Sequence, residues 1–254
     1  MLNGIGAAAA SRHSSFVRAR GAVVGVVALL VTQQALAAYE VAAVTNGGTI
    51  DGIVTLSGTA PEAQLKVTKN QDYCGQTIPN PAYTVGSNGG LANVIVYLKD
   101  ITKGKAAPSE PLALVNSKCM FSPRVQGAMV SQQVKISSED PVLHNTHPQN
   151  SETNATIFNV ALPFKGFSVT KPLPAMPMMI KVKCDAHEWM HAWIMELDHP
   201  YYTTTNADGH FTIKDVPPGT YTLAVWHEVA GEQSAPVTVT AGQVVKPSIA
   251  LAAK

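Results

Sequence analysis

The sequence carries little charge. Lys, Arg, Asp and Glu make up 14% of its 254 residues, and the formal net charge is +1 at pH 7. A nearly neutral chain lacks the basic surface that nucleic acids require, and it offers little electrostatic steering to any partner. We therefore expect no nucleic-acid partner. No nucleophile–base pair, phosphate-binding loop or pair of carboxylates stands out either, so we do not expect an enzyme.

The chain also lacks an apolar run long enough to span a membrane. The run at residues 21–31 falls well short of the roughly 20 residues that a spanning helix needs. Arg12, Arg18 and Arg20 precede this run and Ala35-Leu36-Ala37 follows it, which is the pattern of a secretory signal peptide. We expect residues 1–37 to be removed near Ala37, leaving a monomeric protein that is periplasmic or secreted and has no membrane span.

Cysteine is scarce, with Cys74, Cys119 and Cys184 as the three positions. In an oxidising compartment an odd cysteine is either a reactive thiol or a metal ligand. The sequence favours a Cys74–Cys119 disulfide, with Cys184 kept as a thiolate by a metal. Two free buried thiols at Cys74 and Cys119 are the alternative.

Helical periodicity is almost absent. Short alternating or β-branched runs take its place, and Gly, Pro, Asn and Asp separate them, a pattern typical of a β-sandwich. The expected strands are residues 49–56, 93–98, 132–136, 156–160, 179–183, 192–197, 211–213, 220–226 and 236–240. The predicted fold class is therefore all-β.

Some of these strands resemble a known small sandwich. The closing segments Thr205-Asn-Ala-Asp-Gly-His-Phe-Thr-Ile213 and Val216-Pro-Pro-Gly-Thr-Tyr-Thr-Leu223 carry the turn residues of two hairpins. Together with the opening strands in residues 49–58 and 90–98, this set resembles the carboxypeptidase regulatory-like (transthyretin-like) domain. The resemblance implies a β-sandwich that binds or rigidifies and has no chemistry of its own.

The sequence offers one clear metal-ligand pattern. Cys184-Asp-Ala-His187-Glu-Trp-Met190 places a thiol, an imidazole and a thioether within seven residues, and His144 lies 40 residues upstream. Two imidazoles, a thiolate and a weak thioether suit copper that alternates between Cu(II) and Cu(I). Short strands on either side of the 184–190 loop would deliver the three loop ligands to one point.

This pattern resembles the cupredoxins, the plastocyanin-like blue copper proteins, and most of all amicyanin. Cys184-x₂-His187-x₂-Met190 has the amicyanin loop spacing, His144-Asn145-Thr146-His147 matches its first-ligand segment, and Phe121-Ser122-Pro123 matches the opening strand. The resemblance implies a Greek-key β-sandwich and one mononuclear copper per chain. The ligands that it implies are His144, Cys184, His187 and Met190.

The two resemblances imply a nested chain. The regulatory-like sandwich would comprise residues 45–105 and 200–254, and the cupredoxin domain, residues 110–198, would be inserted in it or packed beside it. In the alternative, residues 45–100 are extra strands of the copper domain itself.

Several ligand assignments have alternatives. Zinc could use His144, Cys184, His187 and His191, although Met190 is a poor zinc ligand. Met190 could instead be a core residue, and His191 competes with it for the axial position. His147 is expected outside the ligand set. Asp185 stands where cupredoxins often have Ser or Thr, so we expect the cross-link from Asn145 to be altered.

The expected function follows from the copper site. We expect a one-electron carrier whose redox partner is a c-type cytochrome or a dehydrogenase. Electrons would pass through His187, with its ring edge at the surface beside Trp189, Pro163, Phe164 and the segment 176–179. A periplasmic copper-binding protein, chaperone or sensor that does not transfer electrons is the alternative.

Overall fold

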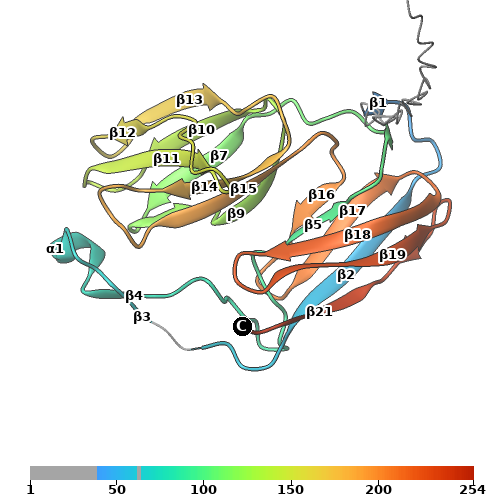
Figure 1. The fold of residues 1–254 in the computed structure, drawn as a ribbon, viewed down its shortest axis with the longest axis horizontal. Coiled ribbons are helices and arrows are strands. Elements are labelled where there is room, and N and C mark those ends of the chain that lie inside the picture. Colours follow the sequence, from blue (N-terminus) through green and yellow to red (C-terminus); the bar gives the residue numbers. More distant parts are fainter. Residues whose placement is uncertain (1–38, 62–63) are drawn as a thin grey trace, which may run out of the picture. The chain divides into compact units, whose positions relative to one another are not determined.

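The computed structural model describes residues 39–61 and 64–254. The expected signal peptide lies outside these residues. No helix in the described part of the chain is long and apolar enough to cross a membrane. The prediction of an all-β protein is confirmed: apart from the short helix α1 (Gln71–Cys74), the regular elements of the described residues are β-strands (Figure 1).

One body of the chain, here called the flanking sandwich, consists of two sheets. The first contains, in spatial order, β16 (Tyr202–Thr204), β5 (Ile95–Leu98), β18 (Gly219–His227) and β19 (Gly231–Val239). The second contains β17 (His210–Val216), β2 (Gly48–Ser57) and β20 (Val244–Val245), with β21 (Ser248–Ala252) also paired to β2. Alternate residues of β2 and β17 are buried, because successive strand residues point to opposite faces. Their inward side chains form a common core with those of β5 and β18.

The second body, here called the central sandwich, is built from residues 112–197. One sheet contains β13 (Ser168–Pro172), β10 (Gln133–Ser138), β7 (Leu112–Ser117) and β8 (Met120–Ser122). The other contains β12 (Val160–Leu162), β11 (His144–Asn150), β14 (Met178–Lys183), β15 (His191–Leu197) and β9 (Val125–Met129). The inward residues of both sheets, such as Ile136, Ile180 and Ile194, form a separate core. A short parallel pair, β1 (Glu40–Val41) with β6 (Lys103–Gly104), lies outside both sandwiches.

The order of the strands along the chain is nested. β2 and β5 precede the strands of the central sandwich, and β16 to β21 follow them. The register pairs Ile50 with Ile213 across β2 and β17, and Val96 with Val225 across β5 and β18. The flanking sandwich is therefore closed by pairings between segments that the whole central sandwich separates in sequence.

Most of the expected strands are present, but one is displaced. The run 156–160 was expected as a strand, whereas the strand in this region is β12, which starts at Val160. Asn150 accepts hydrogen bonds from the backbone of Glu152 and Thr153, and Asn154 has a positive φ of 58°. This turn holds the following residues in a single bridge between Gln149 and Thr156 rather than in a ladder.

A further segment, here called the arm (residues 64–79), lies before the central sandwich in the chain. It comprises β3 (Gln64–Lys66), α1 and β4 (Thr77–Pro79), and β3 pairs with β4. Val67 of the arm is fully buried in the core of the central sandwich. Cys74, the last residue of α1, forms a disulfide with Cys119, with 5.7 Å between the Cα atoms. The predicted disulfide is thus present, and it fastens the arm to the central sandwich.

Candidate metal centre

The loop from Cys184 to Met190 joins two antiparallel strands of the central sandwich. Lys183, at the end of β14, pairs with His191, at the start of β15. Inside the loop, the backbone N–H of His187 donates to the carbonyl of Cys184, and the N–H of Met190 donates to the carbonyl of His187. These hydrogen bonds make a compact loop that brings its side chains back towards the core.

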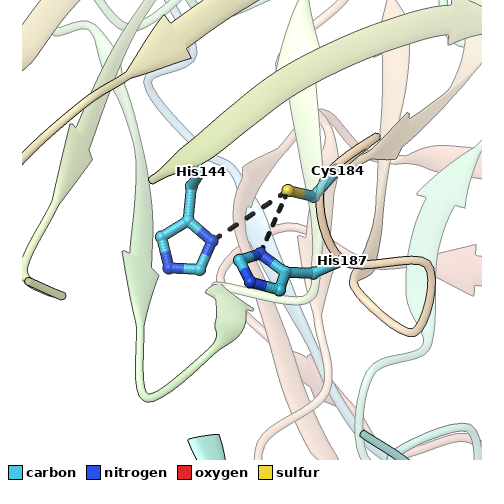
Figure 2. A group of neighbouring side chains, drawn as sticks. All are labelled: His144, Cys184 and His187. Atoms are coloured by element: carbon cyan, nitrogen blue, oxygen red, sulfur yellow. Dashed lines mark hydrogen bonds between the residues drawn. The ribbon is translucent and has the colours of Figure 1, made fainter. Parts of the chain in front are cut away.

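Three of the predicted ligands meet at one point (Figure 2). The Sγ of Cys184 lies 3.6 Å from Nδ1 of His187 and 4.0 Å from Nδ1 of His144, which comes from the start of β11. All three side chains are buried, with relative exposures of 2% for Cys184 and 0% for both histidines. Their potential ligand atoms lie within 4.8 Å of one another, so this group could hold a metal ion. Met190, the fourth predicted ligand, is fully buried in the same core.

Both histidines present the same nitrogen to the thiol because their other nitrogen is held by an oxygen. Nε2 of His144 lies 2.9 Å from Oδ2 of Asp140, and Nε2 of His187 lies 2.9 Å from Oδ1 of Asn70. A carboxylate and an amide oxygen accept hydrogen bonds, so the proton sits on Nε2 and the lone pair on Nδ1. Each Nδ1 lone pair therefore faces Cys184 without further rearrangement.

Asp140 is a buried carboxylate beside His144 that takes part in several hydrogen bonds. It accepts hydrogen bonds from the hydroxyl of Tyr73 at 2.8 Å and from the backbone N–H groups of Lys118 at 2.7 Å and Cys119 at 2.8 Å. Burial alone would raise the pKa of Asp140, but these hydrogen bonds outweigh it and lower the pKa. Burial lowers the pKa of His144. The pair is consequently an ionised carboxylate next to a neutral imidazole, the form that binds a metal.

Burial also shifts the pKa values of His187 and Cys184, the other two residues of this group. It lowers the pKa of His187 to about 4, with a smaller contribution from His144. Burial raises the pKa of the Cys184 thiol, while backbone N–H groups near the sulfur, such as that of Asn145, oppose the rise. A thiolate at this position therefore needs a nearby positive charge, which a bound cation supplies.

Asn145 joins the two parts of the site. Its backbone N–H points to Sγ of Cys184 at 3.4 Å, and its Oδ1 accepts from the N–H groups of Asp185 at 2.6 Å and Ala186 at 3.2 Å. Asp185, which we expected to alter this cross-link, takes part in it through both its N–H and its carboxylate. Nδ2 of Asn145 donates to the Asp185 carboxylate at 2.9 Å, and Asn159 donates to the same carboxylate at 2.8 Å.

The two additional histidines have other partners. Nδ1 of His147 lies 2.9 Å from Asp185, and its Nε2 lies 2.8 Å from the hydroxyl of Thr156. Nδ1 of His191 has no hydrogen-bond partner among the described residues, and burial lowers the pKa of His191 to about 4. Neither histidine belongs to the group of potential ligands around Cys184.

The surroundings of His187 differ from our expectation. Its ring is fully buried rather than exposed at an edge, because Asn70 of the arm covers Nε2. Trp189 is also buried, with its ring 4.9 Å from that of His187 and its Nε1 donating to the carbonyl of Cys119 at 3.1 Å. Of the expected apolar surface, Pro163, Phe164, Met176 and Pro177 are exposed. The Phe164 side chain packs edge-on against Phe167 in the following segment of the chain.

Sequence reasoning missed three residues of the site: Asn70, Tyr73 and Asp140. The available signals were weak but present. Asp140 stands four residues before His144, and Asn70 and Tyr73 stand next to Cys74 in the chain. Once Cys74 was paired with Cys119, its neighbours had to lie near the central sandwich as well.

The donor set fits copper better than zinc. Two neutral imidazole nitrogens and a thiol surround one point, and the remaining buried side chain at the end of the loop is a thioether. A structural zinc site needs four strong ligands, whereas copper accepts a weak thioether as the fourth. The second group of potential ligands, Cys119 with Asp140 and His144, has its sulfur engaged in the disulfide.

Comparisons with known proteins give partial likenesses. A family model described as polysaccharide lyase family 4, domain II, matches residues 182–246. This segment contains the 184–190 loop and β15 of the central sandwich, followed by β16 to β20 of the flanking one. The family that matches is therefore different from the carboxypeptidase regulatory-like domain that we expected. No curated protein matches the chain.

Several solved structures resemble part of the chain. A copper-containing nitrite reductase from Thermus scotoductus SA-01 is 18% identical over 37% of this chain and 24% of the reductase, with a TM-score of 0.32. A purple cupredoxin from Nitrosopumilus maritimus is 18% identical over 34% of this chain and 99% of its own, with a TM-score of 0.30. A reduced amicyanin variant is 12% identical over 36% of this chain and 86% of its own, with a TM-score of 0.31. At these TM-scores the likenesses do not indicate a function for this chain.

Replacing Asn145 tests the cross-link. We expect Asn145→Ala to weaken copper binding by about 10–100-fold, because the loop loses the acceptor for two N–H groups beside Cys184. Competition with a chelator of known affinity measures the change. Asn159→Ala is the matched control, since Asn159 contacts the side chains of Asn145 and Asp185 but makes no hydrogen bond to the backbone of the loop. Equal losses in the two variants would contradict this role for Asn145.

The buried histidines predict acid sensitivity of the metal-free protein. His187 and His191 have a pKa of about 4 when folded and an ordinary value of 6.5, so the unfolded chain binds more protons between these values. Stability should therefore fall as the pH drops from about 6.5 through 4. Thermal melts across this range should show a shallower fall for His191→Asn than for the wild type. A fall of the same steepness in both proteins would be evidence against the depressed pKa of His191.

Proposed function

We propose that this protein binds one copper ion through His144, Cys184, His187 and Met190. The observation that carries the proposal is the convergence of two Nδ1 lone pairs on one buried thiol, with both Nε2 atoms already held by acceptors. When bound, copper would supply a couple that accepts or gives one electron at a time. The chain's own residues supply the fixed geometry around it.

The protein holds its ligands rigidly before any metal arrives. Hydrogen bonds within the loop and from Asn145 fix Cys184, and Asp140 and Asn70 fix the two imidazole rings. The burial of all four ligands excludes water from the site. A site whose side chains are already held in place and shielded from water suits one-electron transfer, because little has to move when the charge changes.

We further propose that the protein is an exported one-electron carrier rather than an enzyme. Its redox partner would be a c-type cytochrome or a dehydrogenase, bound weakly and briefly. The support for this reading is the ligand set, together with the signal-peptide pattern at residues 1–37 of the sequence.

One observation favours a second candidate, copper handling without electron transfer. The ring of His187 is covered by the arm, so the shortest route from this ligand to a docked partner is longer than in a site with an exposed ring edge. A chaperone or a sensor would gain from such a cover, because it slows the loss of the metal.

Substitution of the sulfur ligands tests the copper site. The copper-loaded protein should show a strong visible thiolate-to-copper absorption band that Cys184→Ser abolishes. Met190→Leu should keep the band and shift both its energy and the reduction potential, since a weak thioether ligand would tune the potential. Met195→Leu is the matched control, because Met195 is a buried residue of β15 that belongs to a different hydrophobic cluster. A wild-type protein with intact Cys184 and no such band would refute the type of site proposed.

Electron-transfer kinetics separate the carrier from the copper-handling protein. A carrier should reduce an oxidised c-type cytochrome in stopped-flow experiments within a second at micromolar concentration and then be reduced again without losing its metal. Cys184→Ser is the inactive control. Transfer far slower than this, together with copper delivery to an acceptor protein, would favour the second candidate.

A further inference from the structure

The arm reaches both histidine ligands. Asn70 binds Nε2 of His187 directly, at 2.9 Å. Tyr73 donates to one oxygen of Asp140 at 2.8 Å, and the other oxygen of Asp140 lies 2.9 Å from Nε2 of His144. Residues from outside the central sandwich therefore contact Nε2 of His187 directly and Nε2 of His144 through Asp140.

The conformation of Asn70 suits this position. Its φ is 52°, in the left-handed region that Asn tolerates better than most residues. Its carbonyl accepts hydrogen bonds from the N–H groups of Tyr73 and Cys74, so it also starts the helical turn α1. One residue thus shapes the turn, aligns Tyr73 with Asp140 and covers His187.

Little besides the disulfide holds the arm in place. Its two strands, β3 and β4, pair only with each other among the described residues, and a two-stranded ribbon is marginal on its own. α1 has four residues, and none of them is fully buried. Val67 is the arm residue that is completely buried in the core, and Leu65 and Ile78 pack against the same core but are only half-buried. Segments with few buried apolar contacts open at a low free-energy cost.

The disulfide sits at the point where it can control this opening. Cys74 belongs to the same turn as Asn70 and Tyr73, and Cys119 is fully buried beside Asp140, to which its N–H donates at 2.8 Å. The link between them closes a loop with a sequence separation of 45, so breaking it restores much chain freedom to the arm.

We propose that the arm is a lid over the metal site that the Cys74–Cys119 disulfide locks and a dithiol reductant unlocks, so that thiol–disulfide exchange controls metal exchange. The control of metal exchange rests on the proposed metal binding. The opening of the lid by reduction does not, so the two can be tested apart.

The unlocking step is an ordinary thiol–disulfide exchange. A thiolate of the dithiol attacks Sγ of Cys74, which is half-buried, whereas Cys119 is fully buried. The Cys74–Cys119 bond breaks, and Cys119 leaves as a thiolate that takes up a proton. The second thiol of the reductant then resolves the mixed disulfide and releases Cys74 as a thiol. The reductant supplies both electrons and ends as a disulfide.

Once unlocked, the arm would leave His187. The burial of Val67, the partial burial of Leu65 and Ile78 against the same core, and the hydrogen bonds of Asn70 and Tyr73 would oppose its departure. Loss of Asn70 would free Nε2 of His187 and expose the ring to solvent and to competing ligands. Metal would then leave or enter the site more rapidly.

The first measurement uses metal-free protein, so that it is independent of copper binding. Hydrogen exchange of residues 64–79 is followed in the oxidised wild type, in the wild type reduced with dithiothreitol, and in the variant with both Cys74→Ser and Cys119→Ser. We expect exchange in the arm to be at least about tenfold faster in the last two, while β14 and β15 stay protected. Unchanged exchange in the arm after reduction would overturn the proposal.

The second measurement uses copper-loaded protein and the loss of Cu(I) to a coloured chelator. Both the double variant and the reduced wild type should lose copper about tenfold faster than the oxidised wild type, the size of effect expected when a ligand loses an orienting partner. The double variant is used because Cys74→Ser alone would leave a free Cys119 near Asp140 and His144. A reductant effect that persists in the double variant, or equal rates throughout, would overturn control by this disulfide.

A third measurement uses a variant that keeps the disulfide, so that the result does not depend on whether the cysteine variant folds correctly. Asn70→Gly should speed copper loss while circular dichroism and the disulfide remain unchanged, because glycine keeps the left-handed turn and its carbonyl acceptor and removes the side chain that covers His187. Asp72→Ala on the same turn is the control, since Asp72 is exposed and should leave the rate unchanged. Equal rates for the two variants would contradict the role of Asn70. If reduction speeds hydrogen exchange in the arm but the protein binds no copper, the opening of the lid is supported and the proposed copper binding is refuted.

Discussion

The site depends above all on the hydrogen bonds of Asn145. Its backbone N–H points at the sulfur of Cys184, and its side-chain oxygen binds two N–H groups of the loop that carries three of the four proposed ligands. Since Asn145 follows His144 at the start of β11, the same residue fixes the distance between the first histidine and the loop. Without it, the polar contacts left between the two segments near this point would be that of Cys184 with His144 and that of Asp185 with His147.

The orientation of the two imidazole rings comes from different sources. Asp140 binds Nε2 of His144 from the connection between β10 and β11, four residues earlier in the chain. Asn70 holds His187 from the arm, which is 117 residues away in sequence. The electronic environment of the two ligands therefore differs, with an ionised carboxylate behind one ring and a neutral amide behind the other. A single ion bound between them would sense that asymmetry.

Local patterns in the sequence were sufficient for the parts of the site that are local in structure. The spacing from Cys184 to Met190 fits a tight loop between two strands. Because Cys184 is assigned to the metal site, Cys74 and Cys119 are the two cysteines that remain for a disulfide. The cover of His187 could not be predicted, because it depends on where the arm lies after its chain leaves the flanking sandwich. Strand 156–160 was misplaced for a local reason, since the turn around Asn150 was not recognised. The family model that matches differs from the family expected for the flanking sandwich, and Asp-Gly and Pro-Gly turns could not distinguish the two because they occur in many β-sandwiches.

The nested order of the strands has a thermodynamic consequence for the central sandwich. Its two ends join β5 and β16, which are hydrogen-bonded neighbours in one sheet of the flanking sandwich. If the central sandwich unfolds while the flanking one stays intact, its chain becomes a closed loop rather than a free coil. The unfolded segment then has fewer conformations available than a free coil of the same length. Its conformational entropy is lower, so folding of the central sandwich costs less entropy than it would without the connection to β5 and β16.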